Sequence, residues 1–427
     1  TQIMIKIFIQ NKFVAEKKYV LNYIFGEIYN TEYEILTDNE PLYRFVSDNY
    51  RLIIDDVFFS NFEDGYKYFQ NIINIPTDVD FMTCEGFSFA IPILFGKDEL
   101  RNEDGLIYCG NDIIAAIFFM LTRWEEIANK TKDKHDRFDE KENLSIKYGF
   151  HKRPIVNDYI SVLAKMLNDA GIEVAPSQRD FRLFLTHDID FFARYDKFGK
   201  IVKALLGDIF RRKNFKIFFN TLKTVYKQIF KKAPDVYDKF DFFMDISETK
   251  NVKSEFYFIP GLKGEEGITY SILDKKIKKT IHNIKERNHI IGIHPSYSSY
   301  NNVSQLKREV NRLYNLRIDV SQGRQHFLRY LIPQTFRDWE VCNLKIDSGM
   351  GFNSNIGFRC GICYEFPLFD VELRNQLQLR ERPLIVMDKA LRARCKNQQD
   401  CVNESVRLAN IVKSYNGDFV LLWHNSN

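Results

Sequence analysis

The pattern of apolar and polar positions predicts an α/β domain in the first part of the chain. Residues 3–9 and 51–59 predict strands, and residues 17–25, 112–127 and 154–170 predict helices. Asp112 stands where it can cap the second of these helices, and Gly171 ends the third. The polar, proline-containing segment 175–180 then separates this pattern from a different one. We therefore expect an N-terminal α/β domain of unknown role at residues 1–178.

From residue 181 onward, short apolar stretches alternate with amphipathic ones. The expected strands are 181–185, 254–258, 290–293, 328–331, 343–346 and 419–422, and the expected helices are 272–287 and 303–315. Such alternation is typical of parallel strands joined by helices, in a barrel or a doubly wound sheet. We expect this second domain to occupy residues 179–427. A closed barrel would need a further helix after His424, so we also expect the chain to be truncated there.

A basic segment at about residues 195–235 interrupts the second domain. It is rich in Lys and Arg, poor in acids, and interleaved with Phe, Leu and Ile. One interpretation is an amphipathic helical insertion that lies on an anionic membrane surface, as a peripheral contact, or on an acidic glycan. The other is a solvated helical hairpin that covers the mouth of the barrel. We favour this one because runs of charged residues usually form solvent-exposed faces.

Composition and charge set limits on the function. The net charge of +4 over 427 residues, without a basic–aromatic motif, gives no reason to expect nucleic acid binding. The seven cysteines are scattered and form no zinc-knuckle pattern, which favours a reduced, cytoplasmic setting with the membrane contact left open. Aromatic residues make up 15% of the chain; they can stack on sugars, but a Phe-rich core explains them more simply.

Polar residues that could bind a metal or transfer protons follow several of the expected strands. In parallel α/β folds, active sites form beyond the carboxyl ends of the strands. The strand 181–185 leads into Thr-His-Asp-Ile-Asp at residues 186–190, in which Asp188 and Asp190 face the same way while the chain stays extended. Taken alone, these two acids would be read as a cap and a solvated side chain. His294, His326 and His424 also lie at expected strand boundaries, and this clustering favours a metal or acid–base site.

The order of these segments resembles the five motifs of the polysaccharide deacetylase superfamily, carbohydrate esterase family four. The segments are 186–190, Gly-Ile-His-Pro-Ser-Tyr at 292–297, Arg-Gln-His-Phe-Leu-Arg at 324–329, Ile-Asp-Ser-Gly-Met-Gly-Phe at 346–352 with Gly-Phe-Arg-Cys-Gly at 357–361, and Leu-Leu-Trp-His-Asn at 421–425. The whole chain resembles a bacterial subgroup in which an extra α/β domain precedes the deacetylase. The resemblance implies a distorted parallel (β/α) barrel of the polysaccharide deacetylase type.

The resemblance also implies roles for individual residues. Asp188 corresponds to the general base, His424 to the general acid, and Arg324 to the arginine that orients the base. Asp190 and His294 correspond to metal ligands, although the carboxylate is displaced by one position and His187 could replace it. The family's second motif has two histidines four residues apart, whereas this chain has Ser298 at the second position. His326 could supply the missing ligand if its loop turns inward; otherwise Ser298 or water would fill the place.

The expected substrate is an N-acetylated sugar in a surface polysaccharide or its lipid- or nucleotide-linked precursor. Its expected binding residues are Asp347, Arg359, Tyr297 and Trp423; for Arg359, a buried ion pair that holds the fold together is an equally good interpretation. The expected cofactor is a divalent metal ion, with Zn²⁺ favoured over cobalt or nickel. Two alternatives stay open, namely a degraded deacetylase fold that binds or assembles glycans, and a glycoside hydrolase that uses Asp188 and Asp190 as its carboxylate pair.

Overall fold

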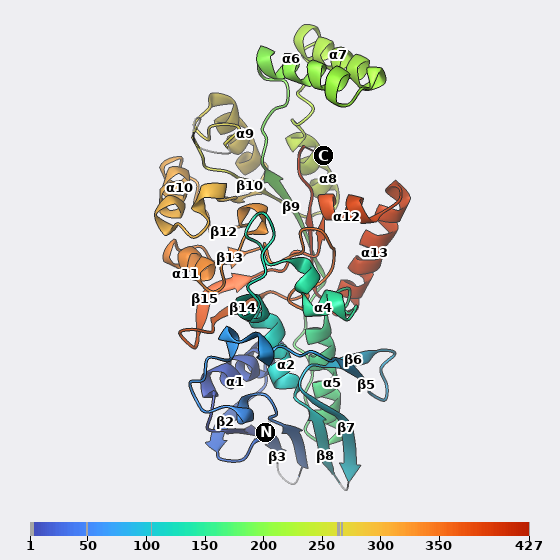
Figure 1. The fold of residues 1–427 in the computed structure, drawn as a ribbon, viewed down its shortest axis with the longest axis vertical. Coiled ribbons are helices and arrows are strands. Elements are labelled where there is room, and N and C mark those ends of the chain that lie inside the picture. The colour runs from blue at the N-terminus through green and yellow to red at the C-terminus, as the bar shows by residue number, and fades with distance from the viewer. Residues whose placement is uncertain (1–3, 48–49, 104, 263–264, 266–267, 427) are drawn as a thin grey trace. The chain divides into compact units, whose positions relative to one another are not determined.

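The computed structural model describes residues 4–47, 50–103, 105–262, 265 and 268–426 and divides into two compact units (Figure 1). Unit 1 comprises residues 1–183, 300–303 and 327–420, and unit 2 comprises residues 184–299, 304–326 and 421–427. Unit 1 thus contains segments from both sides of residue 178, and the linear division expected from the sequence stays a prediction. Of the strand expected at residues 3–9, Ile3 lies outside the described residues.

Unit 1 contains a mixed sheet of six strands in the order β2-β1-β3-β4-β8-β7. These strands are β1 (Ile5–Gln10), β2 (Tyr33–Asp38), β3 (Leu42–Ser47), β4 (Tyr50–Asp55), β7 (Gly96–Glu103) and β8 (Leu106–Asn111). Two short strands, β5 (Asp80–Thr83) and β6 (Ala90–Ile93), form a separate antiparallel pair. Later in the chain, β15 (Asn375–Glu381) pairs antiparallel with β14 (Phe366–Asp370) and parallel with β13 (Ile346–Asp347).

The core of unit 1 is organised around helix α2 (Ile113–Thr122), all of whose residues are buried. Asp112 caps this helix as expected, because its carboxylate accepts a hydrogen bond from the Ala115 amide at 3.0 Å. The other helices of the unit are α1 (Val14–Leu21), continued by η1 (Asn22–Ile28), α3 (Glu125–Ala128), α4 (Leu144–Lys147), α5 (Ile155–Asp169), α11 (Gln334–Val341), α12 (Asp388–Arg394) and α13 (Gln398–Ser414). The short strand β16 (Val386–Met387) precedes α12.

Unit 2 contains the strands that carry the candidate chemistry. Strand β9 (Arg182–Ile189), which enters the unit at Phe184, pairs in parallel with β10 (Ser254–Phe258), and β10 pairs in parallel with β11 (Ile290–Ile293). The two-residue strand β12 (Gln322–Gly323) continues the parallel order, and β17 (Asp418–Leu422) lies on the other side of β9. Every residue of β10 is buried, as expected for a parallel strand that is covered on both faces.

The helices of unit 2 connect these strands. They are α6 (Phe198–Leu206), continued by η6 (Gly207–Arg211), α7 (Phe215–Phe230), α8 (Phe240–Thr249), α9 (Lys275–Glu286) and α10 (Val303–Asn315). Within the segment 195–235, residues 198–211 and 215–230 are helical. The architecture of the described residues is mixed α/β, whereas closure of the strands into a barrel stays a prediction. Among the described residues, no helix is both long and apolar enough to cross a membrane.

The predicted strand at 328–331 is wrong. Leu328 has a φ of 53°, and the preceding Phe327 has a φ of 59°, so both adopt the left-handed conformation that a strand cannot contain. The strand at this place in the fold is β12, which ends at Gly323 before His326 is reached. The apolar run after His326 therefore belongs to a turn.

Candidate metal centre

Parallel pairing places the ends of four strands at one edge of unit 2. In register, Asp188 of β9 lies opposite Tyr257 of β10, and Ile293 of β11 lies opposite Gly323 of β12. The residues just after these positions are therefore neighbours in space although they are far apart in sequence. They include Asp190, His294, Arg324 and His326.

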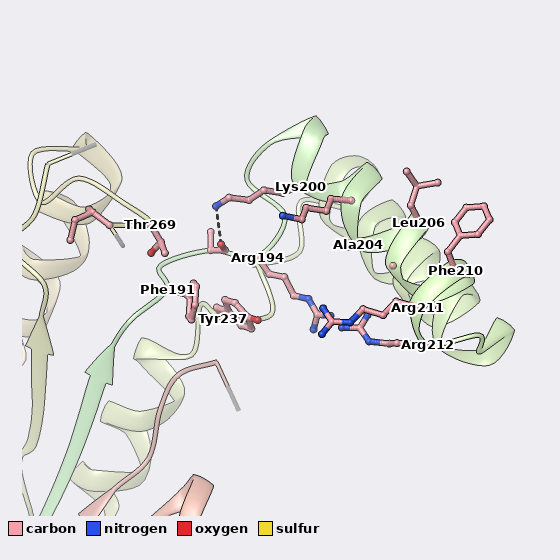
Figure 2. Close-up of a pocket in the computed structure, with 14 residues that line it drawn as sticks. Phe191, Arg194, Lys200, Ala204, Leu206, Phe210, Arg211, Arg212, Tyr237 and Thr269 are labelled. Atoms are coloured by element: carbon pink, nitrogen blue, oxygen red, sulfur yellow. Dashed lines mark hydrogen bonds between the residues drawn. The ribbon is translucent and has the colours of Figure 1, made fainter. Parts of the chain in front are cut away.

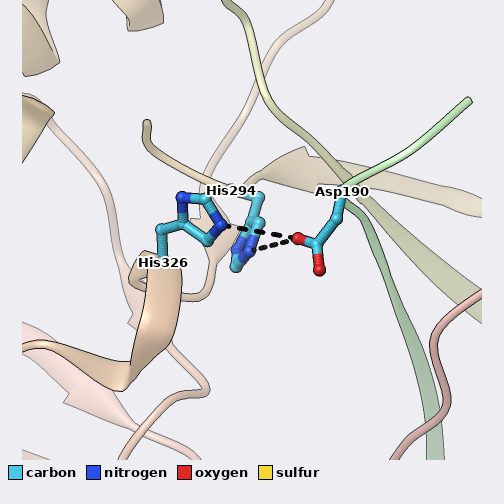
Figure 3. Close-up of side chains that lie close together, drawn as sticks. All are labelled: Asp190, His294 and His326. Atoms are coloured by element: carbon cyan, nitrogen blue, oxygen red, sulfur yellow. Dashed lines mark ion pairs between the residues drawn. The ribbon is translucent and has the colours of Figure 1, made fainter. Parts of the chain in front are cut away.

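Asp190, His294 and His326 converge on one point (Figure 3). The Oδ1 atom of Asp190 lies 3.3 Å from His294 Nε2 and 3.5 Å from His326 Nε2. These separations exceed those of a strong charge-assisted hydrogen bond, which are about 2.7–2.9 Å. They match the spacing of roughly 3.3–3.4 Å between neighbouring ligand atoms that lie about 2.0–2.1 Å from a tetrahedral zinc ion. The ligand atoms of the three side chains all lie within 4.8 Å of one another, so the group could hold a small divalent cation, with His326 as its third member.

The backbone around β12 orients both imidazole rings. His294 Nδ1 lies 2.7 Å from the carbonyl oxygen of Arg324, a contact that fixes the tautomer and leaves Nε2 facing Asp190. The left-handed turn at Phe327 directly follows His326 and diverts the chain there. Asp190 is held through its own backbone, because the hydroxyl of Thr269 donates to its carbonyl oxygen at 2.6 Å.

Asp188 is held by Arg324 beside this group. Arg324 Nη1 donates to Asp188 Oδ1 at 2.7 Å, and Arg324 Nη2 donates to the Thr186 hydroxyl at 2.9 Å. Both Asp188 and Arg324 are almost fully buried. The other carboxylate oxygen, Oδ2, lies 3.9 Å from His294 Nε2 and therefore faces the metal-site side chains. This arrangement leaves one oxygen anchored and the other directed toward the reaction space.

His424 follows strand β17 and reaches the same group from the opposite side of β9. Its Nε2 lies 3.8 Å from Asp190 Oδ2, whereas His294 and His326 approach the other carboxylate oxygen, Oδ1. The main chain is fixed here by the Trp423 amide, which donates to the Thr186 carbonyl at 2.9 Å. His424 is thus a buried imidazole near the ligands, in a place where a proton donor could act.

His187 and Ser298, the two less certain ligands, have other surroundings. His187 Nδ1 lies 2.8 Å from the Trp423 carbonyl and Nε2 lies 3.3 Å from the Ser254 hydroxyl. Its ring also stacks on Phe243, because alternate residues of a strand face opposite ways and His187 therefore points away from Asp188. Ser298 is exposed on a short turn, where its hydroxyl lies 3.0 Å from that of Ser296. Both side chains are therefore engaged away from the Asp190–His294–His326 group.

The charges of the site are strongly coupled. Burial alone would raise the pKa of Asp188, but Arg324 and, to a lesser extent, His294 lower that pKa below its ordinary value. Burial would likewise raise the pKa of Asp190, and the adjacent imidazoles of His294 and His326 hold it well below the ordinary range. For His294, burial acts to lower the pKa, and the two aspartates outweigh it, so that its pKa is raised. Both carboxylates are therefore anionic, which suits a cation.

The residues expected to bind substrate are divided between the two units. Tyr297 and Trp423 belong to unit 2, and the Tyr297 ring lies edge-on to His326 with centroids 6.4 Å apart. Asp347 and Arg359 belong to unit 1. Arg359 forms a buried ion pair with Glu126, with a shortest distance of 2.6 Å, which agrees with the structural interpretation of this residue.

Sequence reasoning did not find the groups that support the site from the connecting segments. Thr269 and Tyr270 lie in a loop without a periodic pattern, yet the Tyr270 hydroxyl donates to the Ile189 carbonyl at 2.7 Å and accepts the Ile259 amide at 2.8 Å. Glu309 of α10 accepts the Ser296 amide at 2.9 Å just after His294. None of these residue types is distinctive in such a position, so no local signal pointed to them.

Comparisons with known proteins give the following matches. A family model described as a family of unknown function, DUF7033, matches residues 5–171. Among solved structures, the chain is similar to a Mycobacterium smegmatis protein that is assigned by inference as a polysaccharide deacetylase. The identity is 13%, the match covers 59% of this chain and 79% of that chain, and the TM-score is 0.34. No curated protein matches the sequence.

Proposed function

We propose that this chain is a metal-dependent hydrolase of the polysaccharide deacetylase type, which removes the acetyl group from an N-acetylated sugar of a bacterial surface polysaccharide or its precursor. The observation that carries the proposal is the group Asp190, His294 and His326, set at zinc-ligand spacing beside an arginine-held Asp188. The motif order described above supplies the reaction type.

The three ligands would hold a divalent ion, with zinc preferred by the Asp and His donors, and cobalt or nickel as further candidates. Such an ion supplies Lewis-acid polarisation of the acetamide carbonyl and makes water more acidic. His294 must lose its proton to bind the ion, because only neutral imidazole is a ligand.

Asp188 is suited to accept the proton of the attacking water. Arg324 holds one of its oxygens and lowers its pKa, so the carboxylate is ionised and its free oxygen keeps a fixed direction. A carboxylate of low pKa is a weak base. Asp188 could therefore accept a proton only from water that a bound metal ion has made more acidic. His424 is suited to donate a proton to the departing amine from the other side of Asp190.

Two further proposals concern the substrate. Tyr297 presents an aromatic surface near His326, and sugar rings stack on such surfaces. Trp423, which precedes His424 in the chain, stays a proposed substrate residue. Asp347 stays a proposed substrate residue, whereas the ion pair of Arg359 with Glu126 favours a structural role for that arginine.

The geometry argues against the two alternative functions. A degraded site would lack its third ligand, but His326 lies where a third ligand is needed. A glycoside hydrolase needs one protonated carboxylic acid with a raised pKa, whereas the pKa values of Asp188 and Asp190 are both lowered.

The test combines metal content with product analysis. The purified full chain should bind about one zinc ion per molecule and release acetate, without new reducing ends, from N-acetylhexosamine oligomers. Asp190→Asn and His326→Ala should each lose both the metal and the activity. His424→Ala should lower turnover by about 10²–10⁴-fold and keep the metal.

A wild-type protein that binds no divalent ion would falsify the catalytic proposal. Reducing ends in place of acetate would show a glycoside hydrolase, and loss of metal in His424→Ala would make His424 a ligand. Ser298→Ala serves as the matched control, because this exposed hydroxyl lies outside the ligand group and its removal should leave metal content unchanged.

A further inference from the structure

Helices α6 and α7 of unit 2 lie side by side (Figure 1). This hairpin, α6–η6–α7, exposes an unusual number of large apolar side chains. Phe215, Phe219 and Phe230 of α7 are 67%, 64% and 70% exposed. Other exposed apolar residues of the hairpin are Phe198, Leu206, Phe210, Ile217, Leu222, Tyr226 and Ile229. A soluble surface rarely carries so many adjacent apolar groups without a binding partner.

The exposed apolar residues of α7, Ile217 excepted, form one stripe. At about 100° per residue, Phe215, Phe219, Leu222, Tyr226, Ile229 and Phe230 fall within an arc of roughly 100°. Lys216, Lys223 and Lys227 occupy the adjoining arc, of roughly 40°, along one border of the stripe. The face that packs within the hairpin is a different one, where Thr221 and Val225 are buried and the Thr221 hydroxyl donates to Asp208 at 2.7 Å.

The charge of the hairpin is almost entirely positive. Residues 209–234 contain eight Lys or Arg and no Asp or Glu. Among the described carboxylates, Asp208 pairs with Arg212, and no other of these eight cations has such an ion pair. Apart from the charge of Arg212, the positive charge of residues 209–234 is therefore not neutralised within the hairpin.

Arg211 and Arg212 also belong to a group of cations that lines a cavity of about 840 Å³ at the base of the hairpin (Figure 2). Its charged lining residues are Arg194, Lys200, Lys203, Arg211 and Arg212, and Phe191, Phe210 and Tyr237 add aromatic surface. Thr269 also lines this cavity and donates its hydroxyl to the carbonyl oxygen of Asp190. The basic cavity thus adjoins the segment that carries the candidate metal ligand.

We propose that the hairpin docks on the surface of an anionic phospholipid bilayer. The apolar stripe of α7 enters the boundary between headgroups and acyl chains, and the lysine row along its border contacts the phosphates, the arrangement that interfacial helices adopt. A second copy of the chain is a poorer occupant, because it would bring two strongly basic segments together, each without an acid in residues 209–234. The docked protein would present its strand-end site to a substrate held at the membrane.

The experiment measures binding of the full chain to vesicles and needs no enzymatic activity, so its result is independent of the proposed deacetylation. The wild type should sediment with vesicles of phosphatidylcholine and phosphatidylglycerol, and much less with phosphatidylcholine alone. The triple variant Phe215→Ser, Phe219→Ser, Phe230→Ser should bind at least about tenfold more weakly. The triple variant Lys216→Glu, Lys223→Glu, Lys227→Glu should lose on the order of 100-fold in affinity for the anionic vesicles.

Matched controls come from elsewhere in unit 2. Phe242→Ser removes a phenylalanine of α8 that is 58% exposed, and Lys275→Glu, Lys278→Glu, Lys279→Glu reverses three exposed lysines at α9. Both controls should bind like the wild type. Equal binding to neutral and anionic vesicles, or no binding to either, overturns the proposal. Self-association in solution that the three serine substitutions abolish, without vesicle binding, would assign the stripe to a second copy instead.

Discussion

Neighbouring residues of strand β9 have opposite surroundings, and this sets their chemistry. Asp188 faces Arg324, and Asp190 faces His294. His187, which directly precedes Asp188, is instead buried against Phe243 and Phe256. Burial, opposed only in part by the contact with the Trp423 carbonyl, lowers the pKa of His187 to about 4. The ring is therefore neutral in the folded protein at neutral pH.

His187 should make stability depend on pH. In the unfolded chain its pKa is about 6.5, so the unfolded state takes up a proton first as the pH falls. This contribution to stability is complete above about pH 6.5, decreases as the pH falls toward 4, and is smallest below 4. The loss amounts to about 3 kcal/mol. The difference in unfolding free energy between the wild type and His187→Gln, measured by urea denaturation in chelator, should therefore shrink by that amount between pH 7 and pH 4. A difference that does not change with pH would contradict this prediction.

The candidate site was accessible to sequence reasoning only where residues follow strong strands. Asp188, Asp190, His294 and His424 could be selected because parallel strands end at one edge. The inward position of His326 could not be predicted outright. It depends on the left-handed residues Phe327 and Leu328, and nothing in this apolar stretch of sequence indicates that conformation. Thr269 and Tyr270 could not be found, because tertiary contacts alone bring their loop to β9.

At the scale of elements, prediction succeeded where the pattern was long or fully buried. Strands 254–258 and 290–293 and helix 303–315 agree with β10, β11 and α10 to the residue. Strand β12 has two residues, which is too short for any periodicity to appear. Arg324 and His326 nevertheless follow directly on this strand, so the least predictable strand of unit 2 positions two of the site's side chains.

The register of β12 against β11 depends on Gly323. A Cβ atom at this position would lie 2.0 Å from the Ile293 carbonyl oxygen, and a backbone atom cannot move aside by changing a rotamer. Gly323→Ala should therefore separate the two strands, destabilise the protein by roughly 1–3 kcal/mol, and weaken zinc binding. Urea denaturation and zinc titration measure the two effects.

Gly199→Ala in α6 is the matched control for this substitution, because nothing lies within 4 Å of a Cβ atom there. This control should be neutral or stabilise by about 0.5–1 kcal/mol, since alanine favours a helix. If Gly323→Ala behaves like Gly199→Ala, close approach of β11 and β12 is not required for the site.

At the scale of the whole molecule, the candidate ligands belong to a single unit. Asp190, His294 and His326 all lie in unit 2, although they are spread from residue 190 to residue 326 of the chain. A cation that binds them joins the ends of β9, β11 and β12, and it binds the folded arrangement in preference to the unfolded chain. Its binding free energy therefore adds to the stability of those strand ends.

Zinc should accordingly slow amide hydrogen exchange in unit 2. At a free zinc concentration of about 100 times the dissociation constant, the added stability is about 2.7 kcal/mol, or roughly a 100-fold decrease in exchange rate where exchange requires opening of the site. The full chain is exchanged and then digested, and mass spectrometry should show this protection in peptides that contain β9, β11 and β12. Asp190→Asn should show none of it, while peptides from α2 of unit 1 serve as the internal reference in both proteins. Equal protection in the wild type and in Asp190→Asn would mean that zinc binds elsewhere, and the three side chains would then have to be explained as a hydrogen-bonded cluster.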